Sequence, residues 1–315
     1  YRNDVTREAD VIEEILRVYG YNNIKFTEKL NASISANQLI EDYQIQNKIG
    51  NQLTALGFHE MMGNSLTSPK YIDLSKALSH ENNIEMLNPL SNDLSVMRQS
   101  MLFNALEALS FNSNRKISDL KLFEFGKTYH QYDAGRQEPK HLSLLVSGLK
   151  GDKNWTLPSS KSTFFYFKGF VINVLERLGI TDYSENGTND ENFSEGLSFS
   201  KNGKLLVEFG TINKSITANF GIDAETFYAD FKWDDVLEEI ATDNFILKAI
   251  PKFPKVKRDL ALLIDENVTF DSLKKTAQQT EKKLLKNINL FDVFTGSKLP
   301  EGKKSYALSF TLQDE

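Results

Sequence analysis

Four charged residues near the start of the chain have the spacing of one helical face. Asp10, Glu13, Glu14 and Arg17 recur at i, i+3, i+4 and i+7. Carboxylates four residues apart repel each other unless water or a cation screens them. With Asp4 just before the expected helix, these acids could supply the oxygen ligands that Mg²⁺ prefers. The alternative is a solvated face with a Glu13–Arg17 ion pair and acids placed near a helix N-terminus, where the macrodipole favours them.

No other familiar catalytic or metal-binding pattern is present in the sequence. There is no cysteine, and the four histidines, His59, His80, His130 and His141, are not paired at metal-ligand spacing. The glycine-rich phosphate loops, the His-Glu-x-x-His motif and the Gly-x-Ser-x-Gly elbow are absent. Glu124 lies inside an expected strand, where it is either a buried functional acid or a structural carboxylate with a partner. We therefore assign no catalytic residue.

The composition is that of a globular protein. The chain has 315 residues, of which 40% are hydrophobic and 25% charged, enough for two or three domains. No apolar run approaches the roughly 18 residues of a membrane span, and the absence of cysteine suits a reducing compartment such as the cytoplasm. The net charge is −6, yet residues 251–315 hold twelve basic and nine acidic residues. This distribution argues against nucleic-acid binding by the whole chain, but it permits the tail to contact phosphate.

The elements that must position these residues mix helices and strands without regular alternation. Helical periodicity predicts helices at about residues 7–19, 39–56, 101–114 and 164–178. The aromatic run Phe164, Phe165 and Phe167 is expected in the core. Alternating apolar residues predict strands in 58–64, 120–129, 141–148 and 227–233, and Asn202-Gly203 predicts a β-hairpin turn. The fold class that this pattern favours is α+β.

The pattern of the sequence changes at residues 250–255, IPKFPK, where two prolines indicate a linker. Beyond it we expect a strand at 256–265, a helix at 270–285 and strands at 287–294 and 303–312. Strand-helix-strand-strand is the first part of a ferredoxin-like unit. The second helix and fourth strand of such a unit would follow Glu315, so we expect this domain to be C-terminally incomplete.

Several of these segments are familiar together. Five of them closely resemble segments of the β subunit of bacterial phenylalanyl-tRNA synthetase and occur in the same order. The chain therefore looks like the C-terminal part of that subunit. The segments are ADVIEEILRVYGYNNI, MLNPLSNDLSVMRQSMLFNALEAL, NRKISDLKLFEFGKTY, FPKVKRDLALLID and INLFDVFTGSKLPEGKKSYALSFTLQDE.

The resemblance implies three parts. Residues 1–25 would end a magnesium-binding helical domain, 26–250 would form a catalytic-like domain with the antiparallel architecture of class II synthetases, and 251–315 would form a ferredoxin-fold anticodon-binding domain. In proteins of this family, acidic residues of the helical domain bind Mg²⁺ at the contact with the α subunit. By position, the ligands here would be Asp4, Asp10, Glu13 and Glu14.

The catalytic-like domain is expected to be inactive. An active class II strand of this type reads Phe-Glu-x-Gly-Arg-x-Phe-Arg-x-Glu, whose second Arg holds the ATP α-phosphate and whose last Glu holds the adenine end. In FEFGKTYHQY these places fall to His130 and Tyr132. A mostly neutral imidazole cannot replace a bidentate guanidinium, and a phenol cannot replace a carboxylate acceptor. No Gly-x-Gly-x-x-Arg segment supplies the other ATP-binding arginine.

The tail is expected to bind the anticodon stem-loop of phenylalanine tRNA. Its candidates are basic residues that contact phosphate and one tyrosine that stacks on a base, namely Lys255, Lys257, Arg258, Lys303, Lys304 and Tyr306. For any single one of them, an ordinary solvated charge or a half-buried ring is the competing interpretation.

The resemblance also implies partners. The family assembles as an (αβ)₂ tetramer in the cytoplasm, and the whole enzyme uses ATP to esterify phenylalanine to its tRNA, so we expect exposed apolar patches where partner chains dock. One rival hypothesis is a stand-alone RNA- or protein-binding module derived from the same fold. Another is a metal-dependent enzyme that uses the acidic helix.

Overall fold

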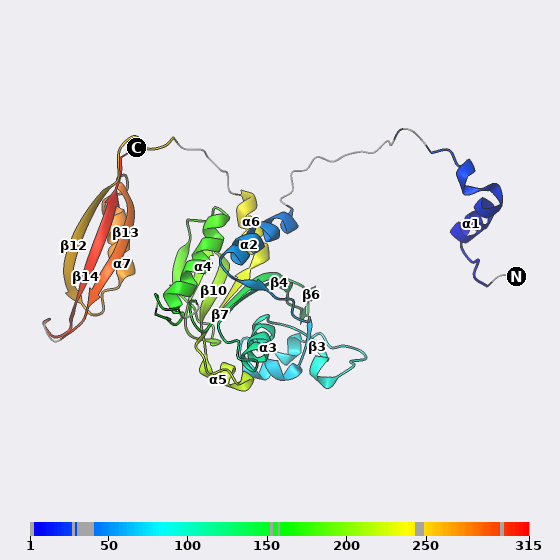
Figure 1. Cartoon of the computed structure of the whole chain (residues 1–315), viewed down its shortest axis with the longest axis horizontal. Coiled ribbons are helices and arrows are strands. Elements are labelled where there is room, and N and C mark those ends of the chain that lie inside the picture. The colour runs from blue at the N-terminus through cyan, green and yellow to red at the C-terminus, as the bar shows by residue number, and fades with distance from the viewer. Residues whose placement is uncertain are drawn as a thin grey trace. The chain divides into compact units, whose positions relative to one another are not determined.

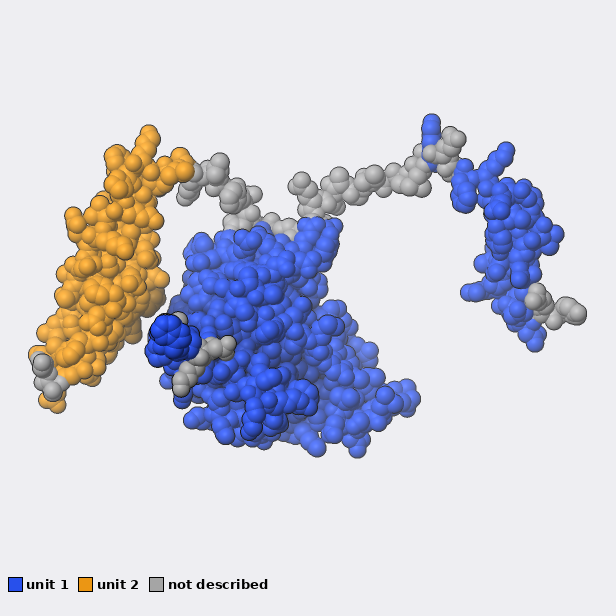
Figure 2. All heavy atoms as spheres, in the orientation of Figure 1, with its two compact units in different colours: residues 1–243 blue, residues 244–315 orange. Residues whose placement is uncertain are grey.

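The protein is described from a computed structural model that defines residues 3–26, 29, 41–151, 154–156, 158–242, 249–296 and 299–314. The chain divides into two compact units, residues 1–243 and residues 244–315 (Figures 1 and 2). No helix in the described ranges is long and apolar enough to cross a membrane.

The first helix, α1, spans Glu8–Tyr19, close to the predicted range. The Asp10 carboxylate caps its N-terminus by accepting the backbone N–H groups of Thr6 at 3.1 Å and Arg7 at 2.9 Å. The helix stops at Gly20, whose φ of +90° favours glycine, and the short helix η1 (Tyr21–Asn23) follows. None of the residues of α1 is buried.

A seven-stranded sheet forms the centre of unit 1 (Figure 1). Neighbouring strands are antiparallel except for the parallel pair β1–β4. The predicted α+β class is confirmed. In spatial order the strands are β1 (His59–Glu60), β4 (Leu120–Lys127), β7 (Lys140–Ser147), β11 (Thr226–Lys232), β10 (Lys204–Ile212), β9 (Phe193–Lys201) and β8 (Ser184–Gly187). The predicted strand at residues 58–64 is reduced to the two residues of β1.

Helices cover both faces of this sheet. One core contains side chains of α2 (Asp42–Ala55), α4 (Phe164–Arg177) and α6 (Trp233–Thr242). The other contains side chains of α3 (Leu102–Ser113) and α5 (Lys214–Thr217). On β7, Leu144 and Val146 belong to the first core and Leu145 to the second, which is the alternation of a strand buried on both faces.

Local sequence signals explain the shape of two of these elements. Asn202 and Gly203 have φ values of 52° and 81°, so both occupy the left-handed region that a tight hairpin turn requires, and the predicted β9–β10 hairpin is present. On α4, Phe167 is fully buried whereas Phe165 is 81% exposed, so the prediction that Phe165 lies in the core is wrong. The reason is helical geometry, because Phe165 lies about 200° around the axis from Phe167.

Short elements complete unit 1. Two small antiparallel ladders pair β2 (Leu66–Thr67) with β3 (Val96–Met97), and β5 (His130–Tyr132) with β6 (Gly135–Gln137). Short 3₁₀ helices occur at η2 (Pro69–Leu74), η3 (His80–Asn82), η4 (Asn92–Leu94) and η5 (Ala218–Phe220).

Unit 2 is a three-stranded antiparallel sheet with one helix. Its elements are β12 (Val256–Asp265), α7 (Phe270–Thr280), β13 (Leu285–Phe294) and β14 (Lys303–Leu312). The strand order β12-β14-β13 places the third strand between the first two. This is the arrangement of the first strand-helix-strand-strand part of a ferredoxin-like fold, as predicted.

Candidate functional site

The predicted metal ligands on and before α1 do not form a cation site in the described part of the chain. The Asp10 carboxylate is already engaged, because it accepts two backbone N–H groups and lies 3.3 Å from Nη2 of Arg7. The backbone N–H of Arg7, and then that of Thr6, lowers the pKa of Asp10. Among the described residues, no three His, Asp or Glu side chains are grouped so that they could hold a metal ion. These side chains therefore do not form a metal-ligand cluster among the described residues, and magnesium binding by them stays a prediction.

The ion pair expected on the same helix also differs. Arg17 donates to Glu14 at 3.0 Å, an i, i+3 contact, rather than to Glu13 four residues away. The Glu14 carboxylate raises the pKa of Arg17. Glu14 is thus held by a cation from its own helix, which argues against its use as a free metal ligand.

One oxygen of Glu124, Oε1, has the partners that a structural carboxylate requires, whereas Oε2 is buried without a hydrogen-bond partner among the described residues. Its side chain on β4 forms an ion pair with Arg98 at 2.9 Å, and the two side chains are 4% and 3% exposed. The backbone N–H of Gly63 also donates to Glu124, at 3.1 Å. Arg98 passes so close to Gly126 that a Cβ there would meet its Nη2 at 2.3 Å. The Arg98–Glu124 ion pair therefore fixes the loop before α3 against β4. Position 126 requires glycine because the Arg98 side chain approaches its backbone so closely.

The segment FEFGKTYHQY, which the resemblance would align with an ATP-binding strand, ends in β5. His130 and Tyr132 lie at its two ends with their rings nearly parallel and their centroids 5.8 Å apart. Burial, followed by the charges of His141 and Lys232, lowers the pKa of His130 below 6.5, so the imidazole is neutral at neutral pH. The position at which the resemblance would place a phosphate-binding arginine thus holds a neutral ring.

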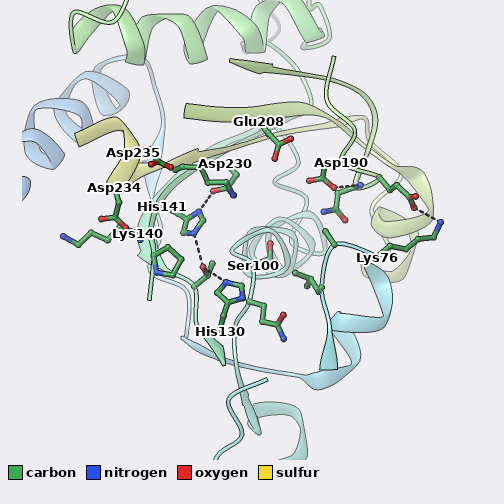
Figure 3. A pocket seen from close by; sticks show the side chains of 18 of the residues that line it. Lys76, Ser100, His130, Lys140, His141, Asp190, Glu208, Asp230, Asp234 and Asp235 are labelled. Atoms are coloured by element: carbon green, nitrogen blue, oxygen red, sulfur yellow. Dashed lines mark hydrogen bonds and ion pairs between the residues drawn. The ribbon is translucent and has the colours of Figure 1, made fainter. Parts of the chain in front are cut away.

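A pocket with a volume of about 640 Å³ opens beside His130 (Figure 3). It is lined by β5, β7, β10 and β11, by the loop around residue 190, by residues 76–78 and by the start of α6. Carboxylates outnumber ammonium groups on its wall. The charged lining residues are Lys76, Lys140 and Lys232 against Asp190, Glu191, Glu208, Asp230, Asp234 and Asp235.

A chain of hydrogen bonds crosses the floor of this pocket. Asp230 contacts Nδ1 of His141 at 2.6 Å, Nε2 of His141 contacts the Thr128 hydroxyl at 3.0 Å, and that hydroxyl contacts Nε2 of His130 at 3.0 Å (Figure 3). The Lys232 ammonium donates to the second oxygen of Asp230 at 2.7 Å. Burial alone would raise the pKa of Asp230, but the His141 and Lys232 charges hold it well below its usual range.

Sequence reasoning missed this group apart from His130. The available signal was weak: Asp230 and Lys232 alternate within an apolar strand and therefore share a face. What brings His141 beside them is strand register, because Lys232 lies directly opposite His141 in the β7–β11 pair. Register between strands about ninety residues apart cannot be read from local periodicity.

In unit 2 the predicted RNA-binding residues occupy two ends of the sheet. Lys255, Lys257 and Arg258 are exposed at the start of β12. Lys303 pairs with Asp265 at the other end of that strand, at 2.6 Å. Lys257 and Asp265 are eight residues apart in β12, which corresponds to about 26 Å of extended chain. The candidates therefore do not form one compact patch.

They also divide between the two faces of the sheet. Leu262 lines an apolar groove together with residues of α7, and Tyr306 lies opposite Leu262 in the β12–β14 register, so Tyr306 shares the helix-side face. Lys304 is on that face too, with its ammonium 4.8 Å from the Tyr306 ring centroid. Lys257 and Lys303 occupy alternate positions and point to the opposite face.

Comparison with known families and proteins gives matches over nearly the whole chain. Residues 26–233 match the family described as phenylalanyl tRNA synthetase beta chain CLM domain, and residues 251–315 match the ferredoxin-fold anticodon binding domain. The phenylalanine–tRNA ligase β subunit of Bacteroides thetaiotaomicron is 43% identical over 329 residues, which cover 100% of this chain and 40% of that protein. The corresponding subunit of Porphyromonas gingivalis is 38% identical over 328 residues, with 100% and 40% coverage.

The chain thus spans 40% of the length of these curated relatives. Among solved structures, a pyrrolysyl tRNA synthetase from Desulfitobacterium hafniense superposes with a TM-score of 0.48 at 16% identity, over 62% of this chain and 66% of that one. This structural likeness is too distant to carry any conclusion.

Proposed function

We propose a function from the premise that this chain belongs to the phenylalanyl-tRNA synthetase β-chain family. The chain would be a non-catalytic β-subunit segment of phenylalanine–tRNA ligase, the enzyme that uses ATP to join phenylalanine to its tRNA. It would contribute subunit assembly and anticodon binding. The observation that carries the proposal is the consecutive match of residues 26–233 and 251–315 to the two domains. The division into residues 1–25, 26–250 and 251–315 is part of the same proposal.

Absence of catalysis in this chain is supported by the wall of its pocket. ATP presents acceptor oxygens and negative charge, which require arginine, lysine or a metal ion. On this wall the corresponding residue is the neutral His130, and most of the charged wall residues are acidic. The bond-making groups would therefore belong to the α subunit.

Anticodon binding is proposed for unit 2. The exposed Lys255, Lys257 and Arg258 would contact phosphates of the anticodon arm of phenylalanine tRNA. The second set, Lys303, Lys304 and Tyr306, is engaged within the chain and would contribute less.

Filter binding of the purified chain to phenylalanine tRNA tests this part. Weak binding that declines as salt rises is expected, because the release of counterions from phosphate is less favourable at higher salt. Affinity that stays constant between low and high salt would contradict a phosphate-binding unit 2.

Docking to an α subunit in an (αβ)₂ assembly is supported by exposed apolar side chains in unit 1. Met62, Leu87 and Leu90 are each at least 94% exposed, and a docking surface for a partner chain would present apolar side chains of this kind. Affinity purification of the tagged chain from its own cells should recover a catalytic α chain in stoichiometric amount. Recovery of RNA or other proteins without that chain would favour a stand-alone binding module. The cytoplasm, where tRNA is charged, is the proposed location.

Magnesium binding at Asp4, Asp10, Glu13 and Glu14 stays a prediction. Within the described residues these acids are not grouped around one point, so a site would need ligands from a partner chain. Titration calorimetry with magnesium chloride should give no heat for the chain alone and a binding isotherm for the αβ complex. Binding by the chain alone would show that the acids rearrange around the ion.

A further inference from the structure

The two outer strands of the unit 2 sheet differ in regularity. The order β12-β14-β13 makes β12 and β13 the edges of this sheet (Figure 1). On β13, the pairing with β14 shifts between Leu285 and Asn287 and again between Leu290 and Asp292, and bulges of this kind protect an edge against further pairing. β12 pairs with β14 at ten consecutive positions without a shift. It is therefore the edge that suits the addition of another strand.

The outer side of β12 has no partner strand among the described residues. Unpaired N–H and C=O groups along such an edge are a template for pairing with another chain. Apolar side chains accompany them. Val256, Leu260 and Leu263 are 40%, 49% and 55% exposed, whereas Leu308, which lies opposite Leu260 on the central strand, is 2% exposed. A further strand would cover apolar surface as well as backbone groups.

The charges on β12 favour one way in which this strand can pair with a copy of itself. Two identical strands that form a closed pair meet antiparallel about a two-fold axis. With the axis at Ala261, Lys257 lies opposite Asp265 of the second copy, and the same pair recurs at the other end. Leu260 and Leu262 lie opposite each other between the two charge pairs. Opposite charges directly across from each other stabilise an antiparallel pair of strands.

Neighbouring registers match the charges of the strand less well. An axis at Leu262 would place Asp259 opposite Asp265, and like charges in this position are destabilising. An axis at Leu260 would place Asp265 opposite Lys255, which precedes the strand. The register centred on Ala261 is therefore the one that we favour, because it pairs opposite charges within β12 at both ends.

Both charged groups are available for this contact. Lys257 and Asp265 are eight residues apart, so they share the face of β12 that points away from α7. Lys257 has no ion-pair partner in the part of the chain that the structure describes. Asp265 pairs with Lys303 at 2.6 Å, but its side chain remains 61% exposed, so an ammonium group from a second copy can share this carboxylate.

We propose that a second copy of this chain adds to the open edge of β12, with the two β12 strands antiparallel about a two-fold axis at Ala261. The pairing joins two three-stranded sheets into one of six strands and places both α7 helices on the same face. Because one pair of edge strands buries little surface, the dimer is weak and depends on concentration. The contact goes beyond the proposed ligase function, since it involves neither RNA nor an α subunit.

Sedimentation equilibrium of the full 315-residue chain over a range of concentrations tests the dimer. The chain should show a monomer–dimer equilibrium without RNA or an α subunit. Lys257→Asp converts both charge pairs into pairs of like charges and should weaken association about tenfold. Lys255→Asp makes the same charge change just before the strand, where Asn267 lies opposite in this register, and should leave association unchanged.

A mixture of two variants locates the register. Asp265→Lys alone should also weaken self-association, because it places a lysine opposite Lys257. Equal amounts of the Lys257→Asp chain and the Asp265→Lys chain restore opposite charges at both ends, so the mixed dimer should be tighter than either variant's own dimer. Thermal unfolding checks that each variant folds, and the two variants at Lys257 and Lys255 decide the matter if Asp265→Lys does not fold.

Three results would overturn the proposal. A chain that stays monomeric at every concentration would leave the β12 edge to a different partner. A dimer that Lys257→Asp leaves intact would lie elsewhere on the molecule. Equal weakening by Lys255→Asp would show that general charge, and not the pairing of Lys257 with Asp265, controls association.

Discussion

Charged side chains reach their positions in different ways in the pocket of unit 1 and on the sheet of unit 2. In the pocket, Asp230, His141 and Thr128 come from separate segments and satisfy one another, and His141 and Thr128 are buried. On the sheet, Lys255 and Lys257 follow each other along one strand end and face water. The first group depends on the whole fold of its unit, whereas the second depends only on a local stretch.

The difference has energetic consequences. Removing one member of a buried, mutually satisfied group leaves its partners without hydrogen bonds or counter-charges, which is costly. Removing an exposed lysine leaves the remaining charges in water, so the fold is scarcely affected and only long-range attraction to a charged ligand changes. Substitutions in the pocket should therefore change stability, and substitutions on the sheet should change RNA affinity.

The largest expected effect is that of Asp230→Asn. The substitution leaves Lys232 without its counter-ion and weakens the acceptor for His141, so unit 1 should lose roughly 3 kcal/mol of unfolding free energy. Urea unfolding followed by fluorescence of Trp233, which is fully buried in unit 1, measures the loss.

The matched control is Glu195→Gln, which replaces an exposed acid on β9. We expect it to change the unfolding free energy by no more than about 0.5 kcal/mol. If both variants lose the same small amount, the pocket charges are no more interdependent than surface charges, and the contrast between the two regions disappears.

An intermediate effect is expected for tRNA binding by unit 2. Replacing Lys255 and Lys257 together by alanine should lower the affinity for phenylalanine tRNA about tenfold and reduce the salt slope by about two, because each lysine would neutralise one phosphate. Lys303→Ala should have a smaller effect because Asp265 already neutralises that ammonium. Filter binding at several salt concentrations measures both quantities. A greater decrease in affinity for Lys303→Ala would place the RNA at the other end of the sheet.

The smallest effect concerns pH. The pKa of His130 is lower in the folded state than its ordinary 6.5, so the folded state binds fewer protons than the unfolded one. Its contribution to stability is present above about pH 6.5 and is lost as pH falls through the folded pKa. Unfolding free energy should decline between about pH 7 and about pH 5, and less steeply in His130→Gln. Identical pH profiles for the two proteins would show that His130 is not buried against the positive charges of the pocket.

The same contrast explains which features of the structure can be predicted from the sequence. The hairpin at Asn202-Gly203 and the helix α3 are predictable because turn chemistry and helical periodicity act over a few residues. The Arg98–Glu124 ion pair and the His141–Asp230 contact join residues 26 and 89 positions apart, and the pairing of distant segments alone decides them. On unit 2, the basic residues were found by type, but their division between two faces required the β12–β14 pairing.

The central claim is that this chain shapes and anchors a reaction whose chemistry lies in another subunit. Phenylalanine-dependent exchange of pyrophosphate into ATP by the purified chain tests it most directly. The claim predicts no exchange above background for the chain alone and exchange once the α subunit is added. Exchange by the chain alone, abolished by a substitution in the pocket beside His130, would contradict it.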